Sequence, residues 1–144
     1  MAYSTITKPG LYFNTNLYTG NDADNRGITG IGFQPDWVWL KKRNATAGGA
    51  IFDAVRGAGK VIYPSETNAE GTETASFVSF DSDGYTISQD AGVGLNVNND
   101  TYVGWNWKAG TGQGSSNTDG SINTTYTSVN TTAGFSIIKY TGTG

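Results

Sequence analysis

The sequence predicts an all-β fold, an antiparallel β-sandwich or jelly roll. Its apolar runs are short, and no window repeats apolar residues about every 3.6 positions, as a helix would. Glycine is frequent at 21 residues whereas proline numbers only 3, a composition typical of strands joined by tight turns. Turn signals recur about every eight to twelve residues, which favours antiparallel strands over crossover connections. The four Trp, eight Tyr and six Phe residues exclude a disordered chain.

The first half of the chain predicts four strands. The strongest covers residues 36–41, where both alternating faces are apolar, and a strand covered on both faces is central in its sheet. Segment 50–56 is the nearest helix candidate, but glycines close in front of it and behind it argue against a helix. The four strands are expected at residues 11–19, 27–33, 36–41 and 59–63.

The second half predicts six more strands. Asp83 and Gly84 separate two alternating apolar runs, which is a strong hairpin signal. A turn is expected at 98–100, before a run with clean alternation. The strands are expected at residues 75–80, 85–87, 94–97, 101–108, 121–128 and 135–141.

The four tryptophans are the candidate core aromatics. They alternate with other residues in two predicted strands, so each pair shares one face. Large indole rings gain most from burial, and we expect this face to turn inward. The residues are Trp37, Trp39, Trp105 and Trp107.

Aromatic residues are also the only plausible handle for a ligand, because sugar rings stack on aromatic faces. The tryptophans themselves could form such a platform if exposed. Tyr102 and Asn106, opposite the Trp105 face, and Tyr85 beside the hairpin are the candidates for an exposed ligand contact.

Composition excludes several classes of function. The net charge is −3 and the nine basic residues form no stripe, so no nucleic-acid partner is expected. The chain has no Cys and no His, which removes thiol nucleophiles, the Ser-His-Asp triad and the common zinc ligands. No apolar run reaches about 18 residues, so no membrane insertion is expected. The N-terminal residues do not resemble a secretory signal.

Acidic residues offer weak candidates for chemistry. Asp81 and Asp83 have the spacing that opens a calcium loop, but the remaining EF-hand ligands are missing and turn formation explains them as well. Glu66, Glu70 and Glu73 lie close in sequence, yet a loop cluster gives no fixed separation for a glycosidase pair. We therefore expect no enzyme activity and no cofactor, with calcium as the one possible ion.

Two segments repeat the same pattern. Residues 13–20 and 135–142 both place Phe, Tyr, Thr and Gly in the same register. Either a second tandem unit begins at the end of the chain, or two similar strands meet where one domain closes. The domain is therefore expected at 1–134, with 135–144 as the last strand or the start of a following repeat.

Six runs, taken together, resemble a module of tail-fibre and other virion structural proteins of marine bacteriophages, including those of cyanobacteria. They follow the family's order along nearly the whole chain, and the first contains Gly32-Phe33-Gln34-Pro35-Asp36-Trp37. The runs are 32–43, 52–58, 80–85, 102–110, 116–122 and 133–142.

The resemblance implies a lectin-like (concanavalin-type) β-sandwich, often in tandem, in a virion appendage such as a tail fibre. It implies a structural role through contacts with other virion proteins and a homo-oligomer, with a trimer expected from the fibre family. It also implies synthesis in the host bacterial cytoplasm and residence in the virion. The family supplies no catalytic residues. Recognition of a host surface glycan during attachment is the alternative function, and a polysaccharide depolymerase is a third.

Overall fold

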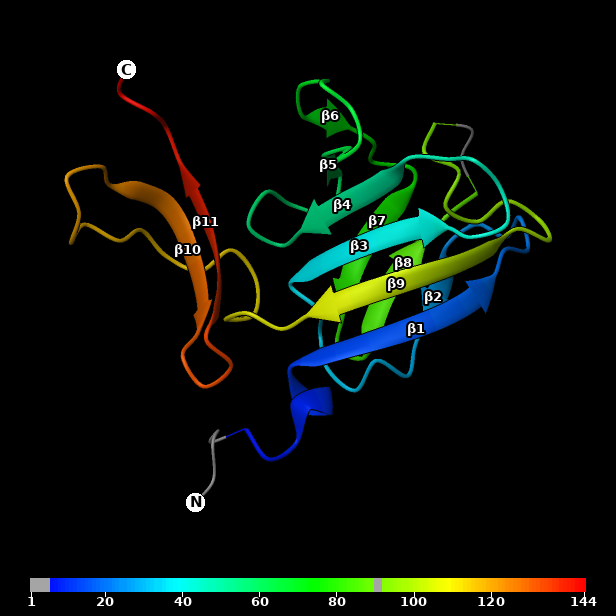
Figure 1. Ribbon diagram of the computed structural model, residues 1–144, viewed down its shortest axis with the longest axis horizontal. Helices are drawn as coiled ribbons and strands as arrows, with labels where there is room; N and C mark the ends of the chain where they lie inside the picture. Colours follow the sequence, from blue (N-terminus) through cyan, green and yellow to red (C-terminus); the bar gives the residue numbers. More distant parts are fainter. Residues whose placement is uncertain (1–5, 90–91) are drawn as a thin grey trace.

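The computed structural model describes residues 6–89 and 92–144, and these residues form an all-β protein (Figure 1). A single 3₁₀ turn, η1 (Pro9–Leu11), precedes the first strand. The strands are β1 (Phe13–Thr19), β2 (Arg26–Ile28), β3 (Trp37–Lys42), β4 (Gly49–Asp53), β5 (Lys60–Val61), β6 (Gly71–Thr72), β7 (Phe77–Asp81), β8 (Gly84–Ile87), β9 (Thr101–Trp107), β10 (Thr124–Asn130) and β11 (Phe135–Tyr140).

Two antiparallel sheets form the sandwich. A four-stranded sheet has the order β1-β9-β3-β4, and a three-stranded sheet has the order β2-β8-β7. The larger sheet lies in front of the smaller in Figure 1, and every strand pair is antiparallel. The predicted all-β antiparallel sandwich is confirmed, and β3 is a central strand as its two apolar faces indicated.

The core lies between the two sheets. Val38 and Leu40 of β3 face inward with Phe52 of β4, and all three are at most 1% exposed. Phe77 and Tyr85 come from the smaller sheet and stack on one another at 5.4 Å. The full core cluster also holds Ile28, Ile31, Phe33, Ala50, Val61, Ile87 and Leu95.

The tryptophans do not fill this core, so that prediction is wrong. All four lie on the other face of the larger sheet, and none belongs to the core cluster. The alternation in β9 was read correctly, but the opposite set, Tyr102, Gly104 and Asn106, faces inward. A Cβ at Gly104 would lie 2.8 Å from the Tyr85 hydroxyl, so the inner layer has no room for an indole there.

The expected strand at 94–97 is absent, because the Tyr102 side chain and loop backbone N–H groups bond to this segment in place of a neighbouring strand. The Tyr102 hydroxyl donates to the Gly94 carbonyl at 2.7 Å and accepts from the Val97 N–H at 3.1 Å. Asn96 is fully buried and bonds to Asn21. The helix candidate at 50–56 instead forms β4 and a turn.

The expected strand at 27–33 ends early, at Ile28. Gly30 and Gly32 have φ angles of +84° and +88°, which break an extended strand. Their N–H groups donate to the two carboxylate oxygens of Asp83, at 2.9 and 2.6 Å. The β7–β8 hairpin is confirmed, and its turn fixes this loop.

A second hairpin, β10–β11, stands beside the sandwich (Figure 1). Residues 135–140 thus pair with β10 of the same chain, while 1–5 lie outside the described residues. Phe13 of β1 and Phe135 of β11, equivalent positions in the repeated pattern, both contact Trp107, at ring distances of 4.7 and 6.3 Å. The tandem and closing-strand interpretations both remain predictions.

Candidate functional site

The outer face of the larger sheet is the main candidate site. Strand register places its outward side chains in rows that cross all four strands in the order β1, β9, β3, β4. The first row is Phe13, Trp107, Trp37 and Asp53, the second is Thr15, Trp105, Trp39 and Ile51, and the third is Leu17, Val103, Lys41 and Gly49. We call this surface the aromatic face.

The indole rings on this face hold one another in place. Trp37 meets Trp107 edge-on at 4.6 Å and Trp39 at 6.3 Å. Trp39 meets Trp105 at 5.3 Å in a tilted arrangement. Such offset and edge-to-face contacts are the favourable geometries for aromatic pairs. The result is a preordered surface, because each ring is fixed by its neighbours before any partner arrives.

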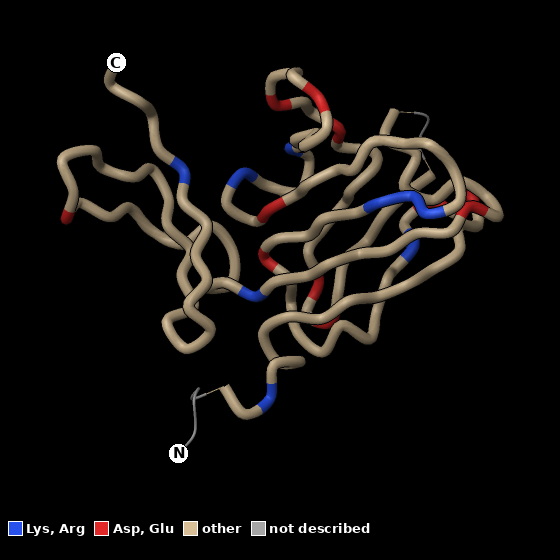
Figure 2. The backbone as a smooth tube through the Cα atoms, in the orientation of Figure 1, with Lys and Arg blue, Asp and Glu red and all other residues tan. Residues whose placement is uncertain are grey.

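Several apolar side chains of this face remain open to solvent. Leu17 is 62% exposed and Phe13 is 38% exposed, and the tryptophans are half-buried. Figure 2 shows that β1 and β9 carry no charged residue, so the aromatic face is charged only through Lys41 and Asp53. Contiguous exposed apolar surface of this kind marks an interaction site.

Phe13 and Leu17 also belong to this surface, although they were not among the candidate residues predicted from the sequence. Their alternation along residues 11–19 was visible, and it places both on one face of their strand. The register with β9, which sets them beside the tryptophans, comes only from the structure.

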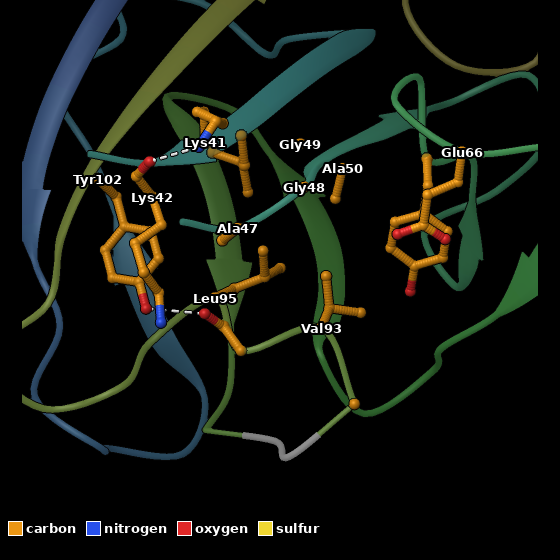
Figure 3. A pocket seen from close by; sticks show the side chains of 14 residues that line it. Lys41, Lys42, Ala47, Gly48, Gly49, Ala50, Glu66, Val93, Leu95 and Tyr102 are labelled. Carbon is orange, nitrogen blue, oxygen red and sulfur yellow. Dashed lines mark hydrogen bonds between the residues drawn. The ribbon is translucent and has the colours of Figure 1, made fainter. Parts of the chain in front are cut away.

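A pocket of about 370 Å³ lies at one end of the larger sheet (Figure 3). Leu40 and Ala50 form part of its wall, and Val93 and Leu95 line it from the loop before β9. The size falls within the range of small-ligand sites, roughly 300–1,000 Å³. Its rim, residues 47–49, includes Gly48, which is exposed and leaves backbone accessible, whereas Gly49 is buried.

Charged groups stand on opposite sides of this pocket. Lys42 forms an ion pair with Asp100 at 2.6 Å, which raises the pKa of Lys42 and lowers the pKa of Asp100. The Lys41 ammonium donates to the Lys42 carbonyl at 2.8 Å. Glu66 lies across the pocket and accepts a hydrogen bond from Asn68 at 2.6 Å.

The three predicted ligand contacts are buried, so their proposed exposure is wrong. Tyr85 and Asn106 are 0% exposed and Tyr102 is 1% exposed. Asn16 joins the first two inside the sandwich, because it bonds to the Tyr85 hydroxyl at 3.2 Å and accepts from Asn106 at 2.9 Å. Burial raises the pKa of Tyr85 and of Tyr102. Only Tyr102 lines the pocket.

The predicted calcium residues each have other partners. Asp83 binds the Gly30 and Gly32 N–H groups, which lower its pKa. Asp81 accepts from the Ser79 and Thr86 hydroxyls, both at 2.7 Å. Within residues 6–89 and 92–144, no group of three or more acidic side chains could hold a metal ion.

Two of the loop glutamates, Glu66 and Glu70, contact different partners. Glu70 faces the cations Arg56 and Lys60, at 3.5 and 3.9 Å. Glu66 instead lines the pocket beside Asn68. Glu66 and Glu70 thus each have a structural neighbour of their own.

Fold and site together define an all-β sandwich protein with an ordered, exposed aromatic face. The chain belongs to the DUF7483 family, a domain of unknown function, which matches residues 8–144. No curated protein and no solved structure matches it. In the part of the chain that the structure describes, no helix is long and apolar enough to cross a bilayer.

Proposed function

We propose that this chain is a structural module of a bacteriophage virion appendage, such as a tail fibre, and acts through protein–protein contacts. In this proposal the sandwich is of the lectin-like, concanavalin type, the chain forms homo-oligomers and resides in the virion. The resemblance of six sequence runs to phage structural modules supports the setting.

The aromatic face is the observation that carries the assembly role. It combines half-buried tryptophans with exposed Leu17 and Phe13. Aromatic residues are enriched in the buried centres of protein interfaces, where they supply most of the binding energy. A neighbour seated here would bury an apolar surface that is already ordered, so little conformational entropy is lost on binding.

Recognition of a host surface glycan is the second candidate, and the pocket favours it. Tyr63 is among the lining residues, and Glu66 lies on one side of the pocket with Lys41 and Lys42 on another. An aromatic ring, ionic groups and accessible backbone together suit a sugar unit, which needs one apolar contact and several hydrogen bonds.

Electron microscopy of the intact particle tests the assembly role. We expect the module in a particle, with a neighbouring protein on the aromatic face that buries more than about 1,000 Å² in total. A module whose aromatic face meets only solvent in the particle would refute the role. Titration with host polysaccharide, with Glu66→Gln as the pocket variant, tests the alternative: weaker binding by the variant supports it, and no binding by the parent chain rejects it.

A further inference from the structure

We propose that β1 is a pairing edge, at which two copies of this chain join their larger sheets through antiparallel β1–β1 hydrogen bonds. The inference deepens the proposed assembly role and rests on it, because it names one surface and one partner. It is carried by the backbone groups at the edge of β1, whose outward side chains Phe13, Thr15 and Leu17 also belong to the aromatic face.

The outer edge of β1 has unused hydrogen-bonding groups. The Tyr12 carbonyl and the Gly20 N–H, which flank β1, bond to the β9 side. Since antiparallel strands alternate, the even-numbered residues face β9 and the odd-numbered ones face away. Within residues 6–89 and 92–144, the outward groups with partners are the Thr15 N–H, which donates to the Asn14 side chain at 2.9 Å, and the Thr19 carbonyl, which accepts from Arg26 at 2.6 Å. Among the described residues, no strand pairs with this edge.

This edge has less protection than the other described edges, because the Arg26 guanidinium at the Thr19 carbonyl guards only its C-terminal end. Natural proteins guard exposed edges with charges, proline, bulges, short strands or covering segments. The β4 edge is covered by a bridge from Ile51 to Ile62, and β10 by one from Ser115 to Thr127. β7 contains a register shift and ends in Asp81, β11 carries Lys139, and β2 and β6 are short. β1 is seven residues long with no charge and no proline.

A second copy matches this edge in polarity and register. In an antiparallel pair centred on Asn16, every odd residue lies opposite an odd residue, so the outward groups of both copies face one another. The Thr15 N–H and the Thr19 carbonyl would exchange their present partners for groups of the other copy. Leu17 then lies opposite Thr15 of the other copy, and Phe13 opposite Thr19. No like charges meet, because β1 has none. The exposed Leu17 side chain would gain cover from its neighbour across the junction.

The geometry also extends the aromatic face. Two strands that pair antiparallel within one sheet are related by a two-fold axis perpendicular to that sheet. Both aromatic faces therefore lie on the same side of one continuous eight-stranded sheet, and a virion partner would meet them as a single surface. A two-fold contact predicts dimers or other even-numbered assemblies, in place of the trimer that the resemblance implies.

Sedimentation equilibrium of the full chain tests the proposal, with two substitutions at one position. Leu17→Lys places two charges at the junction, and Leu17→Pro removes an edge N–H while the β9 ladder keeps its bonds. We expect each to weaken dimerisation at least tenfold. Ile138→Lys, at a 54% exposed site on β11, is the matched control and should leave dimerisation unchanged. Circular dichroism confirms that each variant folds.

Amide exchange gives a second readout that depends only on the backbone. The Leu17 N–H should exchange about tenfold more slowly in a concentrated sample than in a dilute one, because only the dimer pairs it. The Asn16 N–H, which faces β9, should be slow in both. Such a response at Leu17 supports the pairing.

A chain that is monomeric at every concentration, a trimer as the sole assembly, or a dimer unaffected by both Leu17 variants would overturn the proposal. These outcomes leave the tryptophan rows intact. Binding of the parent chain to a purified virion protein tests the assembly role separately, and absence of that binding would reject the assembly role whatever the dimer measurement shows.

Discussion

Replacement of Asp36 by alanine is expected to destabilise the fold by about 4 kcal/mol. Asp36 precedes β3 and is 0% exposed. Its carboxylate accepts backbone hydrogen bonds from Ala109, Thr111 and Gly112, at 2.8, 3.0 and 2.8 Å. These bonds hold the segment that leaves β9 against the sandwich. That segment leads to the β10–β11 hairpin, to which the Gly110 N–H bonds at 3.0 Å through the Ser128 hydroxyl.

The three bonds differ in what their loss costs. A hydrogen bond to a charged group contributes about 1.5–3 kcal/mol. Ala109 is only 3% exposed, so its N–H would stay buried without an acceptor and the full cost applies. Thr111 is exposed and Gly112 is half-buried, so water can replace the carboxylate as acceptor at both N–H groups. Loss of each of these two hydrogen bonds therefore costs about 0.5–1 kcal/mol. Asp36→Asn keeps an acceptor and should cost about 2 kcal/mol.

Urea unfolding followed by circular dichroism measures these differences. Asp24→Ala is the matched control, because Asp24 is exposed and its side chain has no hydrogen bond or ion pair among the described residues. We expect the control to have the same free energy of unfolding as the parent chain. Both Asp36 variants should be less stable, and the alanine variant should be less stable than the asparagine variant. If the alanine variant unfolds within about 1 kcal/mol of the parent, the buried carboxylate is not what holds this segment.

Three further predictions concern stability. Gly84→Ala should destabilise the fold by several kcal/mol in urea unfolding, because Gly84 has a φ of +152° and its Cβ would lie 1.9 Å from the Ile28 carbonyl oxygen. Stability should fall as the pH drops below 3.8, the ordinary pKa of an Asp side chain, because the Gly30 and Gly32 N–H groups lower the pKa of Asp83 in the folded state. The Asp83→Asn variant should show a smaller decrease in stability at low pH, and a decrease equal to that of the parent chain would contradict this prediction. Stability should also fall as the pH rises above 10.0, the ordinary pKa of a tyrosine, because burial raises the pKa of Tyr85 in the folded state while the unfolded chain can ionise. The Tyr85→Phe variant should lose less stability at high pH than the parent chain.

Alternation along the chain was enough to predict most strands, because the period of two is a local property. It could not say which face turns inward. β9 presents tryptophan on one face and Tyr102, Gly104 and Asn106 on the other. The second face is buried because Gly104 admits the Tyr85 hydroxyl and because Asn106 bonds within the sandwich. Both partners are distant in sequence.

Contacts between residues distant in sequence also explain why the candidate sites could not be predicted from the sequence. Tyr102 was a candidate for an exposed contact because it lies on the face opposite Trp105, but it stacks on Tyr18 at 4.9 Å and bonds to the loop at Gly94. The pocket combines residues from β3, the segment after it, the start of β4, the segment between β5 and β6, and the loop before β9. No spacing rule connects these segments, so neither Glu66 nor Lys41 could be assigned to a pocket from sequence alone.

Tryptophan fluorescence tests the central claim most directly, because all four tryptophans of the chain lie on the aromatic face and the signal reports that surface. Acrylamide should quench the isolated chain readily. In the assembled particle, or with its purified virion partner, we predict a blue-shifted emission and clearly weaker quenching. Emission and quenching that stay the same on assembly would contradict the account, because the aromatic face would then remain open to water.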